Sequence, residues 1–152
     1  MKRILIILIV GIFATSLIRK RGSKSEITLD YYSIKKKNSY IYHGPSNQSL
    51  KAFLVLHPNW PVKVIEIKKN WIKVEDYYKN KGWIKSASLG PKKILIIKET
   101  QGYDLSKTSK PIALIEKNIT ANFIKKNEKF TKIEINKKEY WVANDSIWPN
   151  EK

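Results

Sequence analysis

Apolar and polar residues alternate along most of the chain after its first 23 residues. In Trp71–Glu75, Ile72 and Val74 fall on one side, and Trp71, Lys73 and Glu75 fall on the other. A period of two in β-branched and aromatic residues predicts half-buried strands. Turn-forming residues such as Gly44-Pro45 and Gly90-Pro91 interrupt the pattern. Short strands between such turns predict an all-β chain built from small antiparallel barrels or sandwiches.

This pattern occurs twice. Each copy reads aromatic-x-Lys-aliphatic-Glu, a polar turn, x-Trp-aliphatic, and a later aliphatic residue. The first copy is Trp71–Glu75, Gly82–Ile84 and Leu89, and the second is Phe130–Glu134, Tyr140–Val142 and Ile147. Self-similarity of this kind indicates two copies of one β unit. We expect a first unit at 27–90 and a second unit at 92–149, with Trp83 and Trp141 in equivalent places. Two copies favour a binding scaffold over an enzyme with one site.

The first copy also carries a longer set of motifs. They are Tyr40-Ile41-Tyr42-His43-Gly44-Pro45, Pro61-Val62-Lys63-Val64, Asn70-Trp71, Gly82-Trp83-Ile84 and Leu89. This set resembles the bacterial SH3-like (SH3b) family, in particular proteins with two such units in tandem. The resemblance implies two small SH3-like β barrels, the second of them divergent. Phe130 replaces the first Trp there, and Tyr140 replaces the Gly before Trp141.

The N-terminus predicts export. Met1-Lys2-Arg3 precedes an uncharged, mostly aliphatic run at 4–18, and Arg19-Lys20-Arg21 follows it. A basic start followed by such a run is typical of an export signal, and cleavage near Ala14 to Ser16 or retention as an anchor are both open. We therefore expect residues 1–23 to be a signal peptide or membrane anchor. The rest would be periplasmic, or anchored to the inner membrane and facing the periplasm. The chain has no cysteine, so its domains must be stable without disulfides.

The formal net charge is +17, but the excess is spread along the chain. The arginines are Arg3, Arg19 and Arg21, all in the N-terminal segment, whereas bidentate reading of bases and phosphates commonly uses arginine. The sequence therefore gives no indication of specific nucleic-acid binding. A solvated lysine-rich surface and a surface selected for polyanions or anionic membrane both remain open.

Catalytic signals are weak. The histidines are His43 and His57, each next to a turn, and no nucleophile motif accompanies them. Without cysteine, thiol catalysis and soft metal binding are excluded. The acidic pair Glu75-Asp76 is interpreted as a strand end or turn. We expect no enzyme activity, no metal site and no cofactor.

The aromatic residues are the remaining candidates. Trp71, Trp83 and Trp141 are interpreted as core residues, because small barrels need large apolar side chains. Ligand binding is assigned to Tyr40, Tyr42, His43 and Trp60, in a groove beside the Gly44-Pro45 turn, with the second unit as structural support. The family resemblance implies a non-catalytic cell-envelope module that recognises peptide or peptidoglycan. The alternative is a basic protein that binds polyanions or anionic membrane.

Overall fold

The computed structural model describes residue 27 and residues 30–150, and this part of the chain is all-β, as predicted. It forms two antiparallel sheets of seven strands each. The first unit contains β1 (Tyr31–Ile34), β2 (Ser39–Tyr42), β3 (Lys51–Val55), β4 (Trp60–Lys68), β5 (Trp71–Glu75), β6 (Lys81–Lys85) and β7 (Leu89–Gly90). The second contains β8 (Lys93–Ile96), β9 (Thr100–Tyr103), β10 (Pro111–Ile115), β11 (Thr120–Lys126), β12 (Phe130–Ile135), β13 (Lys138–Ala143) and β14 (Ile147–Trp148). A single 3-10 turn precedes the last strand of each unit, at Ser86–Ser88 and Asn144–Ser146.

The two units have the same strand order. The order is β3-β2-β6-β5-β4-β1-β7 in the first and β10-β9-β13-β12-β11-β8-β14 in the second. Trp83 pairs with Tyr42 and Lys73, and Trp141 pairs with Tyr103 and Lys132. The equivalence of Trp83 and Trp141 that the repeat predicts is therefore confirmed, and the two SH3-like units are in tandem.

A β-bulge explains a change of phase in the sequence pattern of β4. The buried residues Val62 and Val64 alternate with polar ones, and the pairing with β5 then shifts between Val64 and Glu66. One extra residue on a strand reverses which face the following side chains occupy. The second unit has its own shift, between Phe123 and Lys125 of β11.

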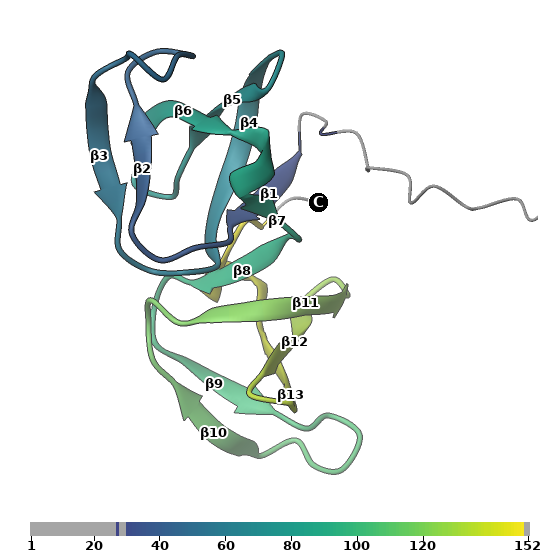
Figure 1. Ribbon diagram of the computed structural model, residues 1–152. Helices are drawn as coiled ribbons and strands as arrows, with labels where there is room; N and C mark the ends of the chain where they lie inside the picture. The colour runs from purple at the N-terminus through teal and green to yellow at the C-terminus, as the bar shows by residue number, and fades with distance from the viewer. Residues whose placement is uncertain (1–26, 28–29, 151–152) are drawn as a thin grey trace, which may run out of the picture.

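The two units are joined through β8, which lies at their boundary (Figure 1). Leu95 is fully buried in the core cluster of the first unit. Its neighbours Ile94 and Ile96 are buried in the core cluster of the second. Successive side chains on a strand point to opposite faces, so this one strand contributes to both cores. The Ser33 hydroxyl also donates to the Pro91 carbonyl across the link (2.7 Å).

Two of the three tryptophans predicted to be core residues are only half-buried, whereas Trp83 is buried. Trp71 is half-buried on the face opposite the core residues Ile72 and Val74, so its assignment to the core is wrong. Trp83 is 7 % exposed, but it pairs with Tyr42 and Lys73 on that same outer face. The Lys73 ammonium lies 5.8 Å from the Trp83 ring centroid, and on the same face the Trp71 ring meets the Tyr42 ring edge to face at 5.5 Å. Trp141 is half-buried.

The second unit has Tyr140 in place of Gly82, and a glycine on the neighbouring strand makes room for this larger side chain. A Cβ on Gly82 would lie 2.3 Å from Cγ2 of Ile41 and 2.9 Å from the Tyr42 carbonyl oxygen. In the second unit the place of Ile41 is taken by Gly102, next to the Tyr103 that pairs with Trp141. A Cβ on Gly102 would meet the Tyr140 ring at 3.0 Å. The same space is filled from β2 in the first unit and from β13 in the second.

The N-terminal prediction lies outside the described residues, because residues 1–23 are not among them. Within the described ranges the structure has no helix with the length and apolar character needed to cross a bilayer.

Candidate ligand-binding hollow

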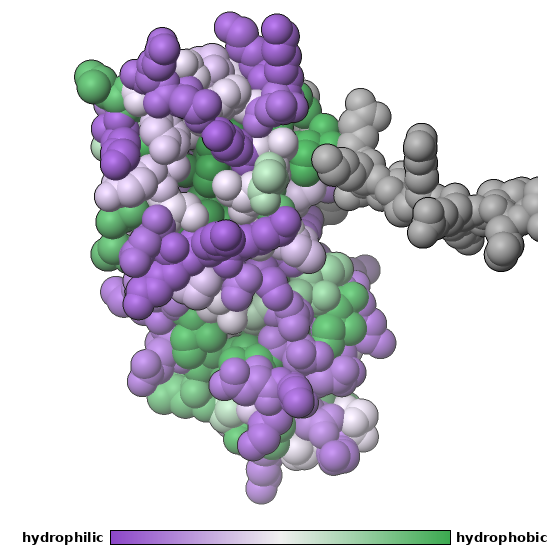
Figure 2. All heavy atoms as spheres, in the orientation of Figure 1, coloured by the Kyte–Doolittle hydropathy of each residue, from purple (hydrophilic) through white to green (hydrophobic). Residues whose placement is uncertain are grey.

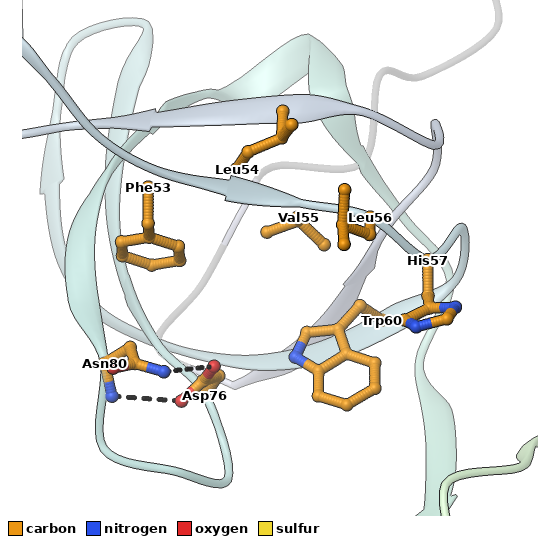
Figure 3. A pocket seen from close by; sticks show the side chains of 8 residues that line it. All are labelled: Phe53, Leu54, Val55, Leu56, His57, Trp60, Asp76 and Asn80. Atoms are coloured by element: carbon orange, nitrogen blue, oxygen red, sulfur yellow. Dashed lines mark hydrogen bonds between the residues drawn. The ribbon is translucent and has the colours of Figure 1, made fainter.

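One end of the first unit has a hollow of about 190 Å³ (Figure 3). Its lining combines apolar side chains with a few polar groups. The lining residues are Phe53, Leu54, Val55, Leu56, His57, Trp60, Asp76 and Asn80. They come from β3 and the turn after it, from the start of β4, and from the loop between β5 and β6. Apolar walls with a small number of convergent polar groups are typical of ligand-binding sites.

Trp60 is placed by the turn that precedes it. Asn59 has a positive φ of 61°, a conformation that asparagine tolerates better than most residues. The Asn59 N–H donates to the Ile34 carbonyl (2.8 Å), and Trp60 then pairs with Ile34 as the first residue of β4. The indole is 9 % exposed and packs in the first core cluster, and its nitrogen is turned toward the side of the hollow that holds Asp76 and Asn80 (Figure 3).

Asp76 and Asn80 close the loop that forms the polar side of the hollow. Asp76 is only 6 % exposed. Its Oδ1 accepts the Asn80 backbone N–H (3.0 Å), and its Oδ2 accepts the Asn80 side-chain amide (3.1 Å). The backbone N–H of Asp76 donates in turn to the Asn80 carbonyl (3.1 Å). A buried carboxyl is costly unless it is hydrogen-bonded, and these bonds fix both its position and the loop.

A row of aromatic rings leads from the hollow to the second unit. His57 lies 6.0 Å from Trp60, and Tyr78 stacks on Trp60 at 6.2 Å with an angle of 16° between the planes. Tyr77 then contacts both Tyr78 and Trp148 of β14. The exposed Tyr78 also donates to Oδ1 of Asn118 (3.3 Å). The aromatic row therefore connects the rim of the hollow to the second unit.

The structure divides the four predicted ligand residues between two surfaces. Trp60 lines the hollow. Tyr42 lies on the outer face against Trp71, and Tyr40 is exposed beneath the Lys51 ammonium, 3.8 Å from its ring centroid. His43 is exposed, and its backbone N–H donates to the Leu50 carbonyl (2.9 Å). Of the four, Trp60 is the one that contributes to the hollow's lining.

The second unit repeats the outer aromatic pair and lacks the parts that form the hollow. Tyr103 meets Phe130 edge to face at 5.8 Å, as Tyr42 meets Trp71. Asn118, with a φ of 66°, precedes Ile119 where Asn59 precedes Trp60. A tight turn at Asn136 and Lys137 stands in place of the Asp76–Asn80 loop. Among the described residues, the two features that frame the hollow therefore belong to the first unit.

The charges near the hollow form a small ion-pair group. Glu75 accepts from Lys79 and Lys81, each at 3.0 Å. The hydrogen bond from Lys79, followed by that from Lys81, lowers the pKa of the Glu75 carboxyl.

In the part of the chain that the structure describes, His, Asp and Glu side chains form no group of three able to hold a metal ion. Over the face shown in Figure 2, hydrophilic residues dominate both units, with apolar residues in separate patches.

Comparison with known families identifies the unit that holds the hollow. Residues 35–91 match the family model of the bacterial SH3 domain. The first unit is a bacterial SH3 domain. The match begins just after β1 and ends at the link to β8, so it includes every residue that lines the hollow.

Two solved structures are similar to the chain over most of its length. NlpC1 from Trichomonas vaginalis is 14 % identical, with a TM-score of 0.37, and the match covers 83 % of this chain and 48 % of that one. NlpC2 from Trichomonas vaginalis is 14 % identical, with a TM-score of 0.36, and the match covers 81 % of this chain and 49 % of that one. The chain thus spans about half the length of these two proteins. No curated protein matches it.

Sequence reasoning missed most of the hollow. Asp76 was interpreted as part of a strand end or turn, and Leu56 gave no separate signal. The connection between β5 and β6 is longer than the tight turn between β12 and β13 in the second copy. This difference in length was the one sequence feature that distinguished the Asp76–Asn80 loop. Comparing the two copies for what differs, in addition to what recurs, would have drawn attention to it.

Proposed function

We propose that the protein is a non-catalytic module of the cell envelope that binds peptidoglycan through the hollow of its bacterial SH3 domain. The observation that carries this proposal is the hollow itself, where a nearly buried tryptophan and a buried carboxyl converge between apolar walls. The Asp76 carboxyl keeps acceptor capacity beyond its two bonds from Asn80, so a polar group of a ligand can be bound there. Peptidoglycan suits the site because it offers amide groups and apolar substituents on one repeating polymer.

The proposal includes export. The basic start and the aliphatic run at 4–18 support transfer across the inner membrane, which would place the SH3-like units in the periplasm. Fractionation of cells that express the full chain tests this part. Recovery of the protein, processed or anchored, with periplasmic or membrane material is expected, and recovery of full-length protein in the cytoplasmic fraction would contradict it.

A second candidate function follows from the charge. With a formal net charge of +17, the protein would attract anionic polymers and lipid headgroups at low salt. Binding of this kind falls steeply as salt rises, because it depends on counterion release and on screened charges. Binding in the hollow depends on short-range contacts and is expected to persist.

Retention on insoluble peptidoglycan at increasing salt separates the two. We expect the wild-type protein to stay bound at 1 M salt, where the Debye length is about 3 Å. A variant with Leu56→Ser and Tyr78→Ser, both exposed at the rim of the hollow, should lose at least tenfold in retention. The matched control carries Ile112→Ser and Leu114→Ser, which remove exposed apolar side chains from β10 of the second unit. Retention that disappears with salt, equally in all three proteins, would replace this proposal with the polyanion one.

A further inference from the structure

We propose that the hollow receives the N-acetyl group of an amino sugar. This inference rests on the proposed function and names the part of the polymer that the site recognises. An acetamido group presents a carbonyl oxygen, an N–H and a methyl group within a few ångströms. The hollow offers a counterpart to each of the three, from Trp60, Asp76 and the apolar wall.

Trp60 supplies the donor. Among the described residues, every fully buried side-chain nitrogen or oxygen atom has a hydrogen-bond partner. Trp60 is only 9 % exposed. Its indole N–H nevertheless makes none of the hydrogen bonds found in the described part of the chain. The nitrogen is therefore open to the hollow, toward which it is turned (Figure 3). A tryptophan N–H can only donate, so its partner must be an acceptor such as a carbonyl oxygen.

Asp76 supplies the acceptor. Its carboxyl is buried, and each oxygen accepts one hydrogen bond from Asn80. A carboxylate has about four acceptor positions, so capacity for a ligand N–H remains. Among the described residues, the hydrogen bonds to this carboxyl come from the neutral amide groups of Asn80, and the neighbouring Lys79 and Lys81 ammonium groups pair with Glu75 instead. A neutral N–H donor completes this arrangement without adding a charge.

The walls and the size suit one substituent of a larger ligand. Phe53, Val55 and Leu56 provide apolar surface for a methyl group. The volume of about 190 Å³ is below the roughly 300–1,000 Å³ of pockets that enclose a whole small molecule. The remainder of the ligand must therefore lie outside. The exposed rings of His57 and Tyr78 flank Trp60 at the rim and offer flat faces on which a sugar ring can rest.

An ammonium group is a poorer occupant. It would pair with Asp76, but it would bring a cation against the Trp60 N–H, which is itself a donor. The formal net charge of +17 also disfavours a cationic ligand. The acetamido group satisfies both polar groups at once, and this is the reason for choosing it.

Two neutral oligosaccharides that differ at one substituent test the inference. The hexamer of β-1,4-linked N-acetylglucosamine carries an acetamido group where the hexamer of β-1,4-linked glucose carries a hydroxyl. We expect calorimetric titration of the full chain to give at least tenfold tighter binding of the N-acetylated hexamer. Trp60→Phe keeps an aromatic ring and removes the donor, and it should weaken that binding about three- to tenfold, the effect of one lost hydrogen bond. Circular dichroism establishes that the variant is folded.

The outcomes keep this inference separate from the proposed function. Equal affinity for the two hexamers, or a folded Trp60→Phe variant that binds as the wild type does, would overturn the acetamido assignment. Suppose that the wild-type protein is then still retained on peptidoglycan at 1 M salt while the variant with Leu56→Ser and Tyr78→Ser is not. In that case the hollow binds another part of the polymer, and the proposed function stands. If the wild type is not retained and binds neither hexamer, both proposals fail.

Discussion

The two tryptophans of the first repeat copy differ in what they contribute to stability. Trp83 is nearly buried by its neighbours, whereas Trp71 is half-buried on the outer face. We expect Trp83→Ala to lower the free energy of unfolding by about 3–5 kcal/mol, in the range of large aromatic truncations. Trp71→Ala should cost clearly less, because much of its surface already meets water. Urea denaturation of both variants measures this, and equal losses would contradict the placement of Trp71.

Glu75 should give the first unit a measurable acid sensitivity. Its pKa is lowered in the folded protein by hydrogen bonds from Lys79 and then Lys81. A depressed folded pKa means that the stabilisation is present above the unfolded value, about 4.3, and is lost as pH falls through the folded pKa. Glu75→Gln should therefore flatten the decline of unfolding free energy below about pH 4.3. Glu116→Gln, at an exposed carboxyl with no ion pair in the described structure, should leave the decline unchanged; equal effects of the two would contradict this role.

Residue by residue, the sequence predicted less of the candidate hollow than of the fold. The indole of Trp60 was identified because aromatic residues near turns are natural candidates for ligand contact. Asp76 was not, because its burial depends on how the loop closes over the sheet through Asn80. Tyr42 and Trp60 are close to similar turns in sequence, yet they contact different partners, Trp71 and Tyr78. Proximity to a turn does not determine which end of a barrel a side chain reaches.

At the scale of elements, β2 and β6 share one tightly packed position. Gly82→Ala should destabilise the protein by about 1–3 kcal/mol, because the new Cβ would meet the Ile41 side chain and the Tyr42 carbonyl. Ile41→Ala alone should cost about 2–5 kcal/mol as a core truncation. The double variant imitates the small residue that the second unit has at Gly102. Its cost should be less than the sum of the two single costs, and strict additivity in this double-mutant cycle would contradict the explanation.

The strands themselves were largely predictable, because alternation and turn residues act locally. The phase change in β4 was visible as Val62 and Val64 giving way to Ile65 and Ile67, and the bulge is its physical cause. The role of β8 was not visible. Three consecutive apolar residues, Ile94 to Ile96, indicate burial on both faces of a strand, but only the assembled structure shows that the two faces belong to different cores.

At the scale of the whole molecule, the two units should unfold together. Leu95 of β8 is fully buried in the first core, and Trp148 of β14 contacts Tyr31 and Tyr77 of the first unit. Leu95→Ala should therefore lower the midpoint of a single cooperative transition, with a cost of about 2–5 kcal/mol. Coincident denaturation curves from tryptophan fluorescence and far-UV circular dichroism check this. Two separate transitions, with only one shifted by Leu95→Ala, would contradict a shared strand.

We propose that one end of the first unit binds the ligand and that the second unit supports it. The most direct test is the map of backbone amide shifts when soluble peptidoglycan fragments are added to the isotopically labelled protein. The account predicts shifts confined to residues 53–60 and 76–80, around the hollow, with Tyr103 and Phe130 unchanged. Shifts centred on Tyr42 and Trp71, or on the equivalent pair in the second unit, would contradict it and place the binding surface on the outer aromatic face.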